Sequence, residues 1–322
     1  MARFLIRRVL LGVLVLLIVY VVIFGMFFIG PGPDSVARNL AGKSATPATV
    51  ALIKKRLLLD RPLVVQFQHF MDRLLFHADL GHDYYHGQAV VTVIKQAFPI
   101  TLDLAIGSAI LWLLIGIMTG VLSAVRRGSI WDRLATVMAL FFYSIPAFVL
   151  GLLLLYVFYY RFTLWHIRIF PGQGYVYFSA NPLKWFESLV LPCLTLALIS
   201  AAAYARLTRG SMLDVLGEDY IRTARAKGLK ERRVTYRHAL RAALTPVVSQ
   251  FGIDIGTLLG GAVLTETVFG MPGLGYTAVH AIEFQDLPVI IGIVIVAATA
   301  IVAANVLVDL AYAFLDPRVR LH

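Results

Sequence analysis

Six long apolar stretches limit what this chain can fold into. Each has about the 20 residues that an α-helix needs to cross the hydrocarbon core of a bilayer. Backbone polar groups in lipid must find partners within the protein, so helices are expected for such stretches. The composition, with 59% hydrophobic and 15% charged residues, excludes an ordinary soluble domain. The sequence predicts an all-α membrane protein whose six transmembrane helices lie near 9–30, 99–125, 134–160, 188–207, 243–267 and 288–315.

The Lys and Arg residues between these stretches predict the orientation of the chain. Short connections that face the cytoplasm carry an excess of these residues. The second connection, the segment 206–241 and the tail 316–322 are rich in them, whereas the fifth connection, 266–287, has none. Both termini are therefore expected in the cytoplasm. The net charge of +11 is assigned to loops that face anionic lipid headgroups, and no nucleic-acid partner is expected.

The first connection, 31–98, is too long for a structureless loop and too rich in Leu, Val and Phe to be disordered. We expect it to form a small extracytoplasmic cap with its own helices. Thr46 and Pro47 are typical of an N-cap and a first helical residue, and Pro62 opens a second amphipathic helix that runs to about Phe76. The predicted domains are a first helix (1–30), the cap (31–98), a five-helix core (99–315) and a cytoplasmic tail (316–322).

Four possible metal ligands cluster in the cap: His77, His82, Asp83 and His86. The i, i+4 spacing of His82 and His86 would place two imidazoles on one face of a helix. Gly81 and Gly87 interrupt such a helix, however. We interpret these residues as surface histidines without a bound metal, with a metal site on His82 and His86 as the alternative.

Two features of the predicted spans concern helix shape and packing. The third span contains Ser144-Ile145-Pro146, where proline removes a backbone hydrogen bond, so a kink is expected, with a moving gate as the alternative. In the fifth span, Gly252, Gly256 and Gly260 recur every four residues. They form a helical face without side chains, which a neighbouring helix can approach closely.

Polar residues inside the spans are costly in lipid and are expected to face the protein interior. Asp254 lies on the same helix as the glycine face. It is interpreted as a partner for a neighbouring helix, with the lining of a route for a polar solute as the alternative. Asn305 and Asp309 in the last span are interpreted in the same way.

The segment that follows the glycine face ends the helix near the outer surface. It runs from Glu266 to Gly275 and is rich in glycine, and a short amphipathic stretch to Phe284 comes after it. Irregular backbone at that depth must be buried in protein or face a cavity. We interpret it as a re-entrant turn at an outer gate formed by Glu266, Phe269, Pro272 and Gly273.

The fourth connection, 208–242, is predicted to form two short cytoplasmic helices, and we call it the coupling segment. Its first helix begins with Glu218 and Asp219 and ends at Gly228, in agreement with the helix dipole and with a glycine C-cap. A second helical stretch starts at Glu231 and leads back to the membrane. Two helices joined at a glycine offer a surface to a cytoplasmic partner. The alternative is a solvated basic loop at the headgroups.

These residues resemble the membrane-spanning permease subunits of bacterial ATP-binding-cassette importers, and among them the dipeptide, oligopeptide and nickel permeases of the first-subunit type. The segment YIRTARAKGLKERRVTYRHALRAALTPV, 220–247, is similar to the coupling motif of that family, whose core is Glu-Ala-Ala, three residues and Gly. Here the core begins Arg222-Thr223-Ala224 and ends at Gly228, so the Glu and the first Ala are replaced. This departure favours the peptide branch. Further similarity lies in RRGSIWDR at 126–133, SIPAFVLGLLLLYVF at 144–158 and TETVFGMPGLGY at 265–276.

The resemblance implies a subunit of a peptide importer in the bacterial cytoplasmic membrane, with nickel, haem or another small solute as the alternative cargo. The implied partners are a second similar permease, two cytoplasmic ATPase subunits that bind ATP and Mg, and an extracytoplasmic substrate-binding protein. The residues implied to contact an ATPase are Tyr220, Arg222, Thr223, Ala224, Arg225, Ala226, Lys227, Gly228 and Leu229.

No catalytic residue and no cofactor are expected in this chain. Gly42-Lys43-Ser44 resembles the end of a phosphate-binding loop, but Ala37 stands where such a loop needs its first glycine. The chain is therefore not expected to be an enzyme. A secondary transporter is the alternative of another class, although we find neither paired broken helices nor an inverted repeat in the sequence.

Overall fold

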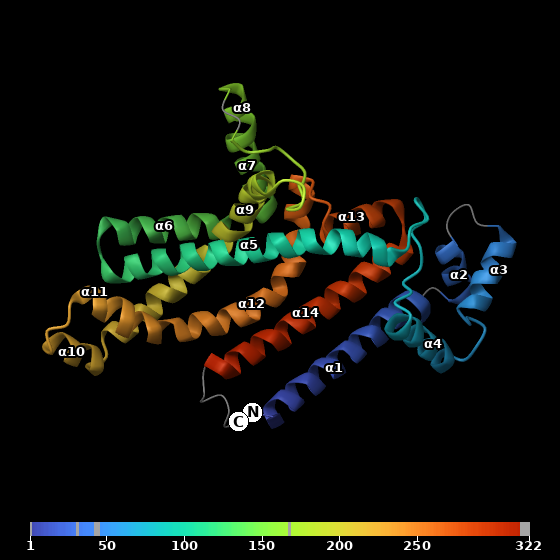
Figure 1. Ribbon diagram of the computed structural model, residues 1–322, viewed down its shortest axis with the longest axis horizontal. Coiled ribbons are helices and arrows are strands. Elements are labelled where there is room, and N and C mark those ends of the chain that lie inside the picture. Colours follow the sequence, from blue (N-terminus) through green and yellow to red (C-terminus); the bar gives the residue numbers. More distant parts are fainter. Residues whose placement is uncertain (1, 30–31, 42–45, 167–168, 316–322) are drawn as a thin grey trace. The chain divides into compact units, whose positions relative to one another are not determined.

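The computed structural model describes residues 2–29, 32–41, 46–166 and 169–315 (Figure 1). Within these ranges the chain forms helices joined by loops, and the β pairing among them is one isolated bridge between His82 and Ala89. The chain divides into two compact units. The terminal unit comprises Met1–Ile100 and Gly273–His322, and the central unit comprises Thr101–Pro272. The predicted tail and Gly42-Lys43-Ser44 lie outside the described residues.

Among the described residues, five helical segments are long and apolar enough to cross a membrane: Ile6–Ile29, Val90–Val125, Ala147–Leu164, Pro182–Leu216 and Leu287–Val308. The predicted run 243–267 forms part of α12 (Leu240–Phe269), whose 30 residues have the length of a span but which is not among these five. The all-α membrane class is confirmed. A count of six spans stays a prediction.

In the terminal unit, the first and last long helices pack along each other. They are α1 (Ala2–Phe24), continued by the π-helical turn η1 (Gly25–Ile29), and α14 (Leu287–Leu315). The Tyr20 hydroxyl lies 2.8 Å from Oγ1 of Thr299, and it joins the two helices by a hydrogen bond. Helix α13 (Leu274–Phe284) also packs on α14.

Three short helices of the cap belong to the terminal unit: α2 (Pro33–Ala41), α3 (Pro47–Arg56) and α4 (Leu63–Phe76). The local capping signals predicted two of them. The Thr46 hydroxyl accepts a hydrogen bond of 3.3 Å from the Thr49 amide, and Pro47 is the first helical residue of α3. Pro62 directly precedes α4, which ends at Phe76. Both predicted helix starts are confirmed.

The central unit is built around the long helix α9 (Pro182–Leu216). This helix packs against α12, α6 (Ile130–Ser144) and α7 (Ala147–Leu154). The unit also holds residues 101–125 of α5 (Val90–Val125). Its remaining elements are η2 (Leu155–Arg161), α8 (Phe162–Leu164), α10 (Asp219–Ala226), α11 (Glu231–Arg233) and η3 (Val234–Ala239).

The predicted third span is broken rather than kinked. Helix α6 ends at Ser144, Ile145 is extended with φ −90° and ψ 128°, and Pro146 precedes α7. The prediction of a single helix over 134–160 is wrong at this point. A residue before proline is disfavoured in the α region, and here Ile145 leaves the helix altogether.

Glycines of α5 allow it to approach α9 closely. A Cβ atom added to Gly116 would lie 2.6 Å from Cβ of Tyr204. A Cβ on Gly120 would lie 2.6 Å from the carbonyl oxygen of Ala205. No real side chain tolerates such distances without a shift of the backbone. The two glycines are four residues apart, so they lie on the same face of α5.

Candidate functional site

The coupling segment begins with a short helix whose two ends are well defined. Glu218 precedes α10 in extended conformation, and Asp219 lies in its first turn. At the other end, Gly228 adopts a left-handed conformation with φ +74°. Its amide donates to the Arg225 carbonyl at 2.9 Å, and the Leu229 amide donates to the Ala224 carbonyl at 3.3 Å. This pair of bonds is a Schellman motif, and the predicted glycine C-cap is confirmed.

The coupling segment is a packed structure rather than a loose loop. Ile221 is fully buried and Ala224 is 8% exposed, both on the inner face of α10. They pack with the ends of two long helices and with the elements that lead into α12, and Leu229 packs beside them. The buried residues of this cluster are Val121, Ala124, Met212, Ile221, Ala224, Val234, Ala239 and Ala243. The cluster therefore joins α10 to α5, α9 and α12 through direct contacts.

The outer face of α10 is polar, basic and accessible. The exposed residues are Tyr220, Arg222, Thr223, Arg225, Ala226, Lys227 and Gly228. Two ion pairs order this face: Arg222 lies 3.2 Å from Asp219, and Arg225 lies 2.7 Å from Glu231. Such exposed pairs contribute little stability, so their main effect is on side-chain orientation. Of the nine residues implied to contact a partner, Ala224 is buried and Leu229 is half-buried, and the other seven are exposed.

An ion pair missed by the sequence analysis joins three helices near the coupling segment. Arg209 of α9 donates to both carboxylate oxygens of Asp132 at 2.8 and 3.0 Å. The Ser123 hydroxyl of α5 and the Gly128 amide also donate to this carboxylate. Hydrogen bonds from Arg209, Ser123 and Gly128 hold the pKa of Asp132 well below its usual range, although its burial opposes this.

The sequence around Asp132 contains a signal for its place in the structure, whereas the sequence around Arg209 does not. Asp132 is three residues after Ser129, and the Ser129 hydroxyl caps α6 by accepting a bond of 3.3 Å from the Asp132 amide. This spacing is typical of a helix start. It identifies Asp132 as a residue of the first turn. It carries no information on Arg209, which is 77 residues away in the sequence.

The predicted intramembrane carboxylate has partners on two helices. Asp254 accepts a hydrogen bond of 2.9 Å from the Tyr204 hydroxyl of α9 and another of 2.9 Å from Nε2 of Gln250. This geometry fits the packing interpretation. Gly252 lies on the same helix, whereas for Gly256 and Gly260 only the backbone of α12 is described. The glycine face stays a prediction.

The predicted outer turn is held by hydrogen bonds within the central unit. Glu266 is fully buried and accepts a bond of 2.6 Å from the Thr101 hydroxyl. Helix α12 ends at Phe269, which is 2% exposed, and its carbonyl accepts from the Gly174 amide at 2.8 Å. Gly270 turns the chain with φ +60°. Hydrogen bonds and burial thus hold the turn from Glu266 to Gly270 within the protein.

The remaining predicted residues lie around these features. Ser144 donates its hydroxyl to the Leu140 carbonyl at 2.8 Å. Pro272 is exposed, and Gly273 is the residue before α13. In the last helix Asn305 is exposed, and the side chain of Asp309 lies outside the described residues.

The histidines of the cap do not share a helical face. His82 forms the isolated bridge with Ala89, and Gly81 and Gly87 have φ of +88° and +65°. His86 lies 3.5 Å from Asp83. In the part of the chain that the structure describes, no three His, Cys, Asp or Glu side chains come together as metal ligands.

Two known protein families match nearly the whole chain. Residues 116–321 match the family described as binding-protein-dependent transport system inner membrane component. Residues 1–105 match the N-terminal region of the membrane components of such systems. The family description and the five apolar helices show a multi-pass protein of the cytoplasmic membrane.

Several relatives share the full length of the chain. The dipeptide transport system permease protein DppB of Escherichia coli is 37% identical over 344 residues, which cover 99% of each chain. The probable D,D-dipeptide transport system permease protein DdpB of Escherichia coli is 41% identical and covers 89% of each chain. The probable peptide ABC transporter permease protein y4tP of Sinorhizobium fredii is 38% identical and covers 99% of this chain and all of its own.

A solved structure shares the fold. A chain of the MetNI methionine ABC transporter, in inward-facing form, superposes with a TM-score of 0.55 over 70% of this chain and 97% of its own, at 18% identity. On the strength of the matched family models and the full-length relatives, the chain belongs to the family of binding-protein-dependent transport system inner membrane components.

Proposed function

We propose that this chain is a permease subunit of an ATP-driven importer and that it forms part of the translocation pathway for di- or oligopeptides. The names of the relatives support peptides as the cargo. The observation that carries the proposal is the coupling segment. Its first helix exposes a basic face while its inner face packs on the ends of α5 and α9.

The proposed partners are those of a complete importer. A second similar permease would complete the pathway, and an extracytoplasmic binding protein would deliver the peptide. Two cytoplasmic ATPase subunits would bind ATP and Mg and perform the hydrolysis, so this chain needs no cofactor of its own. The proposed arrangement has six spans with both termini in the cytoplasm, and the cap on the outer side.

The packing of α10 explains how a partner could move the transmembrane helices. A rigid helix fixed by Ile221 and Ala224 transmits a displacement of its outer face to the helices beneath it, because close-packed interiors deform little. The bidentate contact between Arg209 and Asp132 links α9 to α6 in the same unit. We propose that α5, α6 and α9 respond together when the ATPases close.

The pathway and the gate are assigned as part of the same proposal. Asp254 with the glycine face of α12, and the break at Ser144 to Pro146, are proposed to lie along the route of the peptide. The turn that contains Glu266, Phe269, Pro272 and Gly273 is proposed as the outer gate. Its buried hydrogen bonds support a turn of defined shape that can open as a unit.

Single-cysteine crosslinking tests the coupling contact. The one native cysteine, Cys193, is buried, so its background reaction is low. Ala226→Cys places a thiol on the exposed face of α10, and Ala224→Cys places one on the buried face of the same helix. In membranes with the complete importer, Ala226→Cys should crosslink to an ATPase subunit and Ala224→Cys should not. Equal crosslinking of both variants, or of neither, would contradict the assigned contact face.

A further inference from the structure

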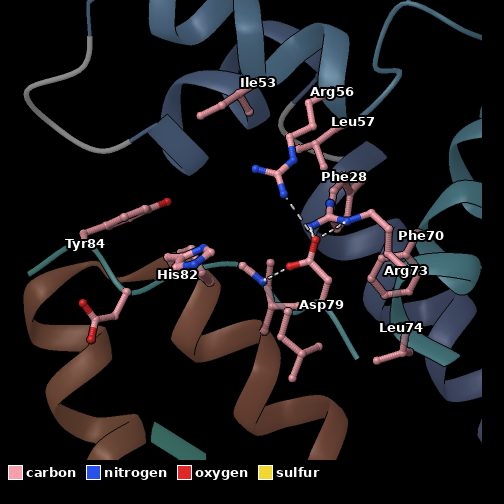
Figure 2. A pocket seen from close by; sticks show the side chains of 15 residues that line it. Phe28, Ile53, Arg56, Leu57, Phe70, Arg73, Leu74, Asp79, His82 and Tyr84 are labelled. Carbon is pink, nitrogen blue, oxygen red and sulfur yellow. Dashed lines mark hydrogen bonds and ion pairs between the residues drawn. The ribbon is translucent and has the colours of Figure 1, made fainter. Parts of the chain in front are cut away.

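A pocket of about 280 Å³ lies in the terminal unit, where the cap helices meet η1 and the start of α14. None of its lining residues belongs to the coupling segment or to the residues assigned to the pathway. Figure 2 shows that Arg56 and Arg73 converge on Asp79, and that His82 and Tyr84 lie across the pocket from them. The pocket thus has a polar side with a defined arrangement of charges.

The polar side has one guanidinium with a strong carboxylate partner and one without. Arg73 donates from Nε and Nη2 to Oδ2 of Asp79 at 3.0 and 2.8 Å, and the Gly81 amide donates to Oδ1 at 3.0 Å. Arg56 reaches the same Oδ2 only at 3.5 Å, and its side chain is 67% exposed. Both oxygens of Asp79 are therefore already engaged, and Arg56 can bind a second anion at little cost.

The state of Asp79 supports this division of roles. Burial alone would raise the pKa of this carboxyl, but the Gly81 amide and the Arg73 guanidinium together lower it. Asp79 therefore remains a carboxylate that orients Arg73. Across the pocket from Arg56, the imidazole of His82 faces the same space and supplies a second donor.

Apolar side chains also line the pocket. Phe28, Leu57, Phe70 and Leu74 line it on the side of Asp79, as Figure 2 shows, and Ile291 of α14 adds to this wall. An apolar wall beside a few placed polar groups is the usual composition of a site for a small ligand. The chemistry selects a ligand with an anionic head and a compact apolar body.

The size of the pocket favours a short peptide over a phospholipid as this ligand. Pockets that enclose drug-sized ligands have volumes of roughly 300 to 1,000 Å³, and this one is at the lower limit of that range. It has room for one or two amino-acid residues and too little for a phospholipid with two acyl chains. The carboxylate of a peptide also matches the fork of an arginine.

We propose that this pocket binds the C-terminal residue of a short peptide, with its carboxylate on Arg56 and His82 and its side chain against Phe28, Leu57 and Phe70. The inference rests on the proposed peptide cargo. The cap, and not only the predicted spans, would then take part in peptide recognition. A free C-terminal carboxylate becomes a criterion of recognition by this chain.

Equilibrium binding with an acid and amide pair tests this site. The full chain in nanodiscs is titrated with tritium-labelled Ala-Phe, with unlabelled Ala-Phe and Ala-Phe amide as competitors. We expect the amide to compete about three- to tenfold more weakly, as for one charge-assisted hydrogen bond at a partly exposed position. In Arg56→Gln the difference should shrink, because only His82 would still contact the carboxylate. In Arg61→Gln, a matched change of an exposed cap arginine that does not line the pocket, the difference should persist.

Three results would overturn the proposal. The first is equal competition by acid and amide in the wild-type chain. The second is an equal effect of Arg56→Gln and Arg61→Gln. The third is Arg56-dependent binding of dihexanoyl phosphatidylglycerol with none of Ala-Phe, which would make the pocket a lipid site. ATP-dependent uptake by the complete importer separates this proposal from the proposed function. If the complete importer takes up peptide but acid and amide compete equally, only the pocket proposal fails. If acid and amide compete differently but no peptide is taken up, only the proposal of peptide import fails.

Discussion

Gly228 is the residue on which the shape of the coupling segment depends most. Its φ of +74° is unfavourable for any residue with a Cβ by about 1–2 kcal/mol, although a Cβ there would meet open space. We predict that Gly228→Val leaves the protein inserted but lowers peptide uptake per ATP hydrolysed, because the end of α10 is displaced. Gly210→Val is the control, since Gly210 also faces open space but lies within helix α9. Unchanged coupling in Gly228→Val would show that the contact with the ATPase lies elsewhere.

The carboxylate of Asp132 should make the stability of the folded protein depend on pH. Its folded pKa is depressed, so its contribution is fully present above the unfolded value of about 3.9 and is lost as the pH falls through the folded pKa. The melting temperature of Asp132→Asn should therefore lie below that of the wild type by a constant amount between pH 5 and 8. The difference should shrink below about pH 4.

The control for this series is Asp219→Asn. Asp219 is almost fully exposed beside Arg222, and its substitution should change the melting temperature little at any pH. A difference between wild type and Asp132→Asn that varied between pH 6 and 8 would contradict the assigned role of the carboxylate.

At the scale of elements, glycines of α5 bring it into close contact with α9. We predict that Gly120→Ala destabilises the protein by about 1–3 kcal/mol, because the new methyl group meets the Ala205 carbonyl and the backbone must shift. Thermal unfolding in detergent measures this. Gly210→Ala should be neutral or stabilising by about 1 kcal/mol. Equal melting temperatures of the two variants would show that the helices can separate freely.

Elements with local signals could be predicted from the sequence, and those set by tertiary contacts could not. Thr46 with Pro47, and Gly228, mark helix ends through their own backbone preferences, and the structure confirms both. Pro146 predicted a kink in the third span, but the helix is broken there. A kink and a break have the same local cause, so the sequence does not distinguish them.

Contacts between distant residues carried weaker signals. The spacing of Gly116 and Gly120 follows the same pattern as the glycine face predicted in the fifth span, yet the pattern alone does not say which span is approached. The pairing of Arg209 with Asp132 and of Tyr204 with Asp254 depends on how α9 lies beside α6 and α12. Only the packed structure provides that information.

Across the whole molecule, different parts of the chain have different proposed tasks. The apolar helices hold it in the membrane, the coupling segment presents a basic face for a partner, and the cap contributes a pocket with a guanidinium at its rim. None of these tasks completes a transport cycle alone. Peptide import is therefore proposed for the assembled importer and not for this chain alone.

Uptake of labelled di- to pentapeptides into proteoliposomes tests that claim most directly. The liposomes contain this chain with its neighbouring permease, the ATPase subunits and the binding protein, and matched liposomes omit this chain. We expect uptake that requires both ATP and this chain. Peptide uptake by this chain without an ATPase would indicate a secondary transporter and contradict the proposed importer. ATP hydrolysis without peptide uptake would contradict the peptide cargo.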